Sequence, residues 1–196
     1  MSITKIDNAL NLVMELPDGK RIYHTPISEA VFEANFKVLA ETKAKLFGKG
    51  MAYAASSGIK ISRLTLLDEG RKLAAENDGD GDYGATALLA EISRLTNVLL
   101  AGDNGWDLLP VANAISQGTV DADDWKDVEN IIVFFTCAYA LASRREKRIV
   151  SEAIAELGNF SLTSSTCEEY MNSLKTPVPS DTRADATKSK RSSIPL

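Results

Sequence analysis

The sequence predicts a mainly α-helical domain that begins with a β-hairpin and ends in a disordered tail. Two short apolar segments flank a Pro-Asp-Gly-Lys turn near the start of the chain. Apolar residues then recur at helical spacing, and Ser, Thr and Pro dominate the end. We therefore divide the chain into a hairpin over residues 1–27 that packs on the helices, a helical domain over 28–158 and a polar tail over 159–196.

Composition limits the class of protein. A chain of 196 residues with 44% hydrophobic residues can bury a core, and its net charge of −5 argues against general binding to a phosphate backbone. Cys137 and Cys167 are too few for a disulfide framework and lack the CxxC spacing of a zinc site. The longest apolar run, 131–142, has about 12 residues, whereas a membrane-spanning helix needs roughly 20. We expect a cytoplasmic protein with no cofactor, no metal and no membrane contact.

The first elements are a hairpin and a helix. Residues 9–16 and 21–27 flank a turn in which Gly19 supplies a positive φ. Ser28 can cap the helix that follows, which Gly48 and Gly50 end near residue 47. The expected buried face of this helix comprises Phe32, Phe36, Leu39, Leu46 and Phe47. The next segment, 51–58, fits a helix by its alanines and a loop by its Ser-Ser-Gly.

Two helices are expected on either side of an acidic loop. The first runs from about Ser62 to Glu76, with Leu64, Leu67 and Leu73 as core positions. The second covers 86–101, where six apolar residues have helical spacing: Leu88, Leu89, Ile92, Leu95, Leu99 and Leu100. A connection that contains Trp106 then leads to a short helix near 110–117, with Pro110 in its first turn.

The last long helical segment spans residues 122–157. Asp121 is its candidate N-cap, and further aspartates close behind meet the positive end of the helix dipole. The segment is either one helix or two that break near Ser143. In the tail, Thr166 and Glu169 have capping-box spacing and predict one short helix near 166–174. Beyond about residue 175 we expect disorder.

The tests for chemistry give no catalytic or metal site. Asp78, Asp80 and Asp82 alternate as in a calcium loop, but Tyr83 stands where the sharp turn needs Gly, and Leu89 where a bidentate Glu should close the site. A solvated loop is therefore favoured. His24 is the only histidine, and neither cysteine has a local nucleophile signature. We expect His24 to be a surface or hairpin-packing residue.

Six residues are candidates for contact with a partner protein. A basic segment follows the apolar run, and Arg144 and Arg148 share a helix face within it. The expected short helix of the tail carries three apolar side chains. The full candidate set is Arg144, Arg145, Arg148, Tyr170, Met171 and Leu174.

Two segments resemble the tail assembly chaperones of long-tailed bacteriophages. The start, LVMELPDGKRIYHTPISEAVFEANFKVLAE, is similar to the amino-terminal hairpin and first helix of several such proteins. The end, GNFSLTSSTCEEYMNSLKTPVPS, resembles their polar segment with a short helix and a Ser/Thr/Pro-rich tail. The resemblance implies a non-enzymatic protein of the host cell cytoplasm that is absent from the mature virion. It would bind the tape measure protein, help to recruit the tail tube protein, and form homo-oligomers if its hairpin pairs with another copy.

A second class of function stays open. A helical regulatory or nucleic-acid-associated protein could use the Arg144–Arg148 face and the basic residues Lys188–Arg191 of the tail. No aromatic residue is interleaved with the first basic segment to stack a base, so nucleic acid is not the expected partner.

Overall fold

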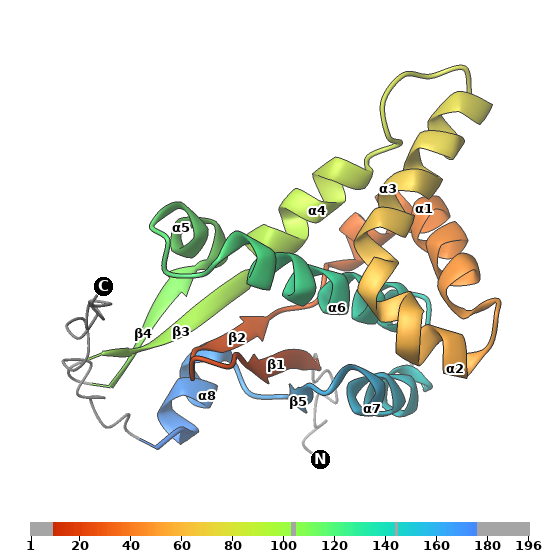
Figure 1. The fold of residues 1–196 in the computed structure, drawn as a ribbon. Coiled ribbons are helices and arrows are strands. Elements are labelled where there is room, and N and C mark those ends of the chain that lie inside the picture. The colour runs from red at the N-terminus through yellow and green to blue at the C-terminus, as the bar shows by residue number, and fades with distance from the viewer. Residues whose placement is uncertain (1–9, 103–104, 144, 176–196) are drawn as a thin grey trace, which may run out of the picture.

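The computed structural model describes residues 10–102, 105–143 and 145–175, and it combines a layer of helices with one antiparallel sheet (Figure 1). Helices make up most of the described chain, and the N-terminal hairpin is present. The hairpin is not a separate appendage, however. It forms the middle of a five-stranded sheet with the order β4-β3-β2-β1-β5.

The sheet brings together strands from distant parts of the sequence. Its strands are β1 (Asn11–Glu15), β2 (Arg21–His24), β3 (Thr96–Gly102), β4 (Gly105–Pro110) and β5 (Ser161–Thr163). β1 and β2 pair with Val13 opposite Tyr23, and β3 joins β2 with Thr96 opposite His24. β5 pairs with β1, and β4 with β3. Because side chains alternate between the two faces of a strand, Ile22 and His24 lie on one face of β2, and Arg21 and Tyr23 on the other.

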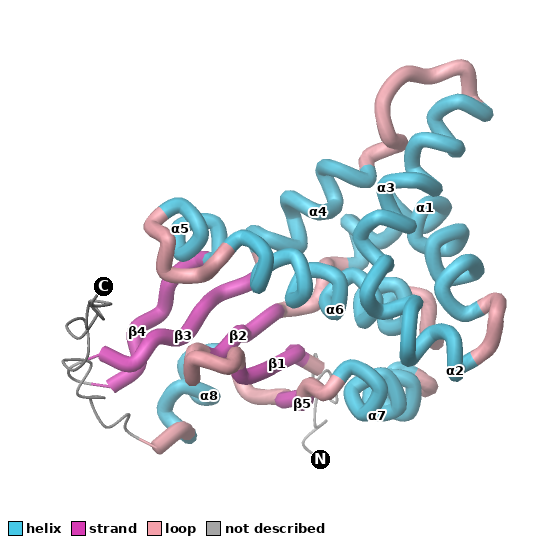
Figure 2. The backbone as a smooth tube through the Cα atoms, viewed as in Figure 1, coloured by secondary structure: helices cyan, strands magenta, loops and turns pink. Residues whose placement is uncertain are grey.

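The helices lie to one side of this sheet, and the first long helices pack on the helix of residues 122–140 rather than on the strands (Figure 2). The helices on this side are α1 (Glu29–Phe47), α2 (Met51–Tyr53), the π-helix η1 (Ala54–Gly58), α3 (Ile59–Glu76), α4 (Ala85–Arg94), α5 (Val111–Ser116), α6 (Ala122–Ala140) and α7 (Lys147–Gly158). α6 is the central helix, with fully buried Phe134 and Phe135. The short α8 (Cys167–Ser173) lies on the opposite face of the sheet (Figure 1). We call the face beneath α8 the outer face.

The predicted helix caps are confirmed. The Ser28 hydroxyl accepts the Val31 backbone N–H at 3.3 Å, and the Asp121 carboxylate accepts that of Asp123 at 2.7 Å. Thr166 and Glu169 form a complete capping box at the start of α8. Caps depend on neighbours in sequence, which is why the residue pattern predicts them well.

The helix predicted over 86–101 is wrong in its second half. α4 ends at Arg94, and the following residues form β3. Thr96 and Val98 are β-branched and face the helical core from the strand, while Leu99 faces the outer side. The connection with Trp106, which we expected to be irregular, is β4.

For two other segments, the structure decides between the conformations that the sequence left open. Residues 51–58 are helical, as α2 and η1, and lead directly into α3. The segment 122–157 is two helices, since α6 ends at Ala140 and α7 begins at Lys147. The expected tail beyond residue 175 lies outside the described residues.

Two predicted core positions are exposed instead. Phe36 of α1 is 56% exposed and Leu64 of α3 is 62% exposed. On α3, Leu73 is buried as predicted and Leu67 packs half-buried against the core, whereas the buried Leu66 was not predicted. Among the described residues, no helix is both long enough and apolar enough to span a membrane.

A glycine in the middle of α3 allows the acidic loop to pack closely against this helix. A Cβ at Gly70 would meet the backbone oxygen of Asp82 and lie 2.8 Å from Ala85 Cβ. We expect Gly70→Ala to lower the free energy of unfolding by about 1–3 kcal/mol through overpacking. An unobstructed Gly→Ala change in a helix would instead raise it by up to about 1 kcal/mol. Urea denaturation measures the difference.

Gly79→Ala is the matched control for this substitution. A Cβ at Gly79 would have its nearest neighbour at 3.5 Å, an ordinary contact, and the backbone there is outside the left-handed region. The control should keep its stability within about 0.5 kcal/mol. Equal stability of the two variants would contradict the close approach at Gly70.

Candidate functional site

A small apolar cluster fills the space between the outer face of the sheet and α8. Three of its members belong to the sheet and are almost fully buried: Val13, Tyr23 and Leu99. Half-buried side chains pack against them from β4 and from α8: Trp106, Cys167, Tyr170, Met171 and Leu174. We call these eight residues the outer-face cluster. It is separate from the main core, which lies on the other side of the sheet.

Polar contacts hold the chain around α8 onto the sheet. The backbone oxygen of Ser165 accepts two hydrogen bonds, from Asn11 Nδ2 at 3.0 Å and from the Tyr23 hydroxyl at 2.7 Å. At the other end of α8, Trp106 Nε1 donates to the backbone oxygen of Lys175 at 3.1 Å. Burial raises the pKa of Tyr23 to about 12, so its hydroxyl stays protonated and remains a donor.

Arg21 is the charged residue of the outer face. Its guanidinium pairs with Glu15 at 2.7 Å and lies 5.6 Å from the centroid of the Trp106 ring. The Tyr23 and Tyr170 rings lie beside it, with centroids 5.9 Å apart. Because Arg21 is paired with Glu15 and lies over the Trp106 ring, this surface offers aromatic rings with little free charge.

The structure divides the six candidate partner-binding residues into two groups. Tyr170, Met171 and Leu174 lie together in the outer-face cluster and pack within the chain. Arg145 and Arg148 lie elsewhere, at the α6–α7 connection and on α7 (Figure 1). Arg144 lies outside the described residues.

Arg148 of this second group and the neighbouring Lys147 already have local partners. Arg148 Nε pairs with Glu152 at 2.8 Å, and Lys147 Nζ lies 4.6 Å from the centroid of the Tyr139 ring. The hydrogen bond with Glu152 raises the pKa of Arg148. The ion pair leaves less charge on this face for an anionic partner than the sequence alone indicates.

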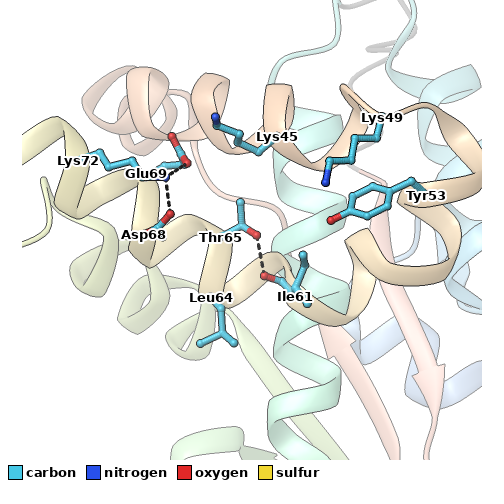
Figure 3. A pocket seen from close by; sticks show the side chains of 9 residues that line it. All are labelled: Lys45, Lys49, Tyr53, Ile61, Leu64, Thr65, Asp68, Glu69 and Lys72. Carbon is cyan, nitrogen blue, oxygen red and sulfur yellow. Dashed lines mark hydrogen bonds and ion pairs between the residues drawn. The ribbon is translucent and has the colours of Figure 1, made fainter.

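A shallow groove between α1 and α3 is a second surface feature (Figure 3). Its volume is about 350 Å³, and we call it the α1–α3 groove. The residues that line it are Lys45, Lys49, Tyr53, Ile61, Leu64, Thr65, Asp68, Glu69 and Lys72.

The groove joins a basic rim to exposed apolar side chains. Lys49 Nζ lies 4.7 Å from the centroid of the Tyr53 ring, and Lys72 pairs with Asp68 and Glu69 at 2.5 and 2.8 Å. The hydrogen bond that Lys72 donates to the Asp68 carboxylate raises the pKa of Lys72. Ile61 and Leu64 are 36% and 62% exposed and lie three residues apart on adjacent turns of α3.

The single histidine and the two cysteines are buried or half-buried. His24 is fully buried, and its Nδ1 lies 2.9 Å from Thr96 Oγ1. Burial raises the pKa of Cys137 to about 12 and also raises the pKa of Cys167. Within the described ranges, no group of three or more His, Cys, Asp or Glu side chains is placed to hold a metal ion.

The acidic loop uses one of its carboxylates to start α4. Asp82 Oδ2 accepts the Thr86 backbone N–H at 2.9 Å and the Thr86 hydroxyl, and the hydroxyl hydrogen bond lowers the pKa of Asp82. We expect Asp82→Ala to cost about 1 kcal/mol, as loss of a helix cap does, and to lower Tm by roughly 2–4 °C. Millimolar calcium should leave the wild-type Tm unchanged in the same thermal scan. A rise in Tm with calcium would restore the metal interpretation of this loop.

Comparison with models of known protein families, with curated proteins and with solved structures finds no match. The residues of these two candidate surfaces that sequence reasoning missed include Arg21, Tyr23 and Trp106 on the outer face, and Ile61 in the groove. In β2, large side chains occur at every position, with Arg21 and Tyr23 on one face and Ile22 and His24 on the other. Such a run could have indicated a strand that is covered on both faces. No local signal places Trp106 beside them.

Proposed function

We propose that this chain is a non-enzymatic tail assembly chaperone of a long-tailed bacteriophage. In this role it binds the tape measure protein and helps to recruit tail tube subunits. The observation that carries the proposal is the similarity of residues 12–41 to the start of such chaperones. In the structure, this segment is the β1–β2 hairpin and most of α1.

The surface of the helical layer supports a role in binding a long apolar helix. A chaperone of this kind needs exposed apolar side chains on a rigid scaffold, with charges around them that keep the free protein soluble. The α1–α3 groove has this composition, with Ile61 and Leu64 next to lysines. Phe36, on the same helix as Lys45, is a further exposed apolar residue.

Co-expression with the tape measure protein of the same phage tests the proposal. We expect a complex that survives size-exclusion chromatography, and soluble tape measure protein only when the chaperone is present. Ile61→Ser/Leu64→Ser should weaken the complex at least tenfold, because it removes apolar contact area. Lys60→Ser/Arg71→Ser, on exposed positions of the same helix, is the control and should keep the complex. A tape measure protein that stays insoluble and unbound beside the chain would overturn the proposal.

Titration with duplex DNA distinguishes the alternative class. A regulatory or nucleic-acid-associated protein would bind DNA with an affinity that falls steeply as salt rises. The pairing of Arg148 with Glu152 favours the chaperone over this alternative. We expect no salt-dependent binding, and the cytoplasm of the host cell is the compartment that the proposal implies.

A further inference from the structure

The charged residues of the α1–α3 groove are divided unequally between its two sides. On the α3 side, Lys72 pairs with both Asp68 and Glu69, so the charges there are matched with one another. On the α1 side, Lys45 and Lys49 are exposed, and neither forms an ion pair with a carboxylate in the described part of the chain. The α1 side of the groove therefore carries two cations without a paired anion.

These two lysines lie on neighbouring turns at the end of α1. They are four residues apart, and Gly48 between them keeps a right-handed helical conformation, with φ −62° and ψ −20°. Residues at this spacing are neighbours on a helix surface, and two like charges there repel each other. The Lys49 ammonium group also lies against the Tyr53 ring at the edge of the groove (Figure 3). A carboxylate bound beside both lysines would offset their repulsion.

Apolar side chains line the same groove. Ile61 and Leu64 contribute to it from α3, and both are exposed. Their exposure also shows that no other described element covers this part of the surface, in contrast to the outer face beneath α8. A ligand that fills the groove therefore meets aliphatic side chains on α3 and ammonium groups at the end of α1.

We infer that the α1–α3 groove selects an acidic amphipathic helix of a partner protein. The helix packs its apolar stripe against Ile61 and Leu64, and aspartates or glutamates beside this stripe bind Lys45 and Lys49. Charge complementarity of this kind favours one partner over others more than it adds to affinity. The inference rests on the proposed function, because the chaperone role supplies the helical occupant, and it adds the charge that this helix must carry.

Designed peptides test the charge preference without any phage protein. All have leucine at positions i, i+3, i+4 and i+7 of a helix, and the residues beside the leucines are glutamate, glutamine or lysine. We expect the full-length chain to bind the glutamate peptide about tenfold more tightly than the lysine peptide, because two exposed ion pairs each add a small gain. Fluorescence anisotropy of the labelled peptides measures the affinities, and the preference should shrink as salt rises.

Lys45→Gln/Lys49→Gln should remove this preference. Its affinity for the glutamine peptide should match that of the wild type, because the apolar contacts remain. Lys60→Gln/Arg71→Gln is the matched control, since it also removes two exposed cations, from positions of α3 that do not line the groove. The control should keep the preference of the wild type.

Three results would overturn the inference. The first is equal binding of the three peptides, or binding of none of them. The second is a preference that survives in Lys45→Gln/Lys49→Gln, which would place the acidic ligand elsewhere on the chain. The third is tighter binding of a single-stranded DNA oligonucleotide than of the glutamate peptide, which would make nucleic acid the partner.

Co-expression with the tape measure protein separates this inference from the proposed function. Lys45→Glu/Lys49→Glu reverses the two charges and should weaken the complex at least tenfold. A complex that survives this reversal but not Ile61→Ser/Leu64→Ser would keep the chaperone role and contradict the charge preference. A preference for the glutamate peptide without any complex with the tape measure protein would contradict the chaperone role alone.

Discussion

Phe134→Ala is expected to lower the free energy of unfolding by about 3–5 kcal/mol, the range for removal of a large aromatic side chain from a core. Phe134 is fully buried on α6, and its ring stacks on that of Phe47 with centroids 4.8 Å apart. Its Cε2 atom also lies 3.6 Å from the position of a Cβ at Gly58, where the π-helix η1 passes α6. The cavity would thus open where three segments meet. Urea denaturation at neutral pH measures the loss.

Phe36→Ala is the control for this variant. It removes the same side chain from α1, but at a position that is 56% exposed. We expect a loss of less than about 1 kcal/mol, since little apolar area returns to water and no cavity forms. Similar losses in the two variants would mean that Phe36 is buried, as its spacing in the sequence predicts, and would contradict the orientation of α1.

The hairpin and the helix caps could be predicted because they depend on residues that are close in sequence. The Pro-Asp-Gly-Lys turn fixes the connection of β1 to β2, and side chains within three positions of the helix starts supply the caps at Ser28, Asp121 and Thr166. These features need no information from the rest of the chain.

The sheet could not be predicted because its pairing is not local. The spacing of apolar residues in β3 fits the continuation of the amphipathic helix before it. Its pairing with β2, about 75 residues earlier in the chain, makes the extended conformation favourable. Its apolar residues face both sides, since the core covers one face and α8 the other. The period of two that marks a half-exposed strand is therefore lost.

The failure to predict the sheet also explains where three of the candidate partner-binding residues lie. Tyr170, Met171 and Leu174 form an apolar stripe on a short polar helix, and from sequence alone such a stripe indicates an external partner. The structure gives it an internal one, formed by Val13, Tyr23 and Leu99. An unpredicted sheet thus led to an unpredicted contact within the chain.

His24 combines full burial with a hydrogen bond that fixes its tautomer. Thr96 Oγ1 donates to the backbone oxygen of Ile92 at 2.7 Å, so it accepts the hydrogen bond that it shares with His24 Nδ1. The imidazole therefore carries its proton on Nδ1. Among the described residues, Nε2 has no hydrogen-bond partner, and burial lowers the pKa of His24 to about 3.

We expect this histidine to make the protein sensitive to acid. Above pH 6.5, the usual pKa, His24 is neutral in both the folded and the unfolded chain, and stability is unaffected by its titration. As pH falls below this value, the unfolded chain binds a proton that the folded chain cannot accept until about pH 3. The free energy of unfolding should therefore fall by about 1.4 kcal/mol for each pH unit within this window.

His24→Asn removes the titration while keeping an N–H group that can reach Thr96. Its stability at pH 7 should be lower than that of the wild type, because a smaller side chain leaves a cavity. The measured quantity is the slope of the free energy of unfolding against pH between 6 and 4, from urea denaturation at each pH. Carboxylates contribute equally to both slopes and cancel in the difference, which should approach about 1.4 kcal/mol per pH unit. Parallel slopes would show that His24 binds its proton in the folded chain, and that the β2–β3 junction opens to water.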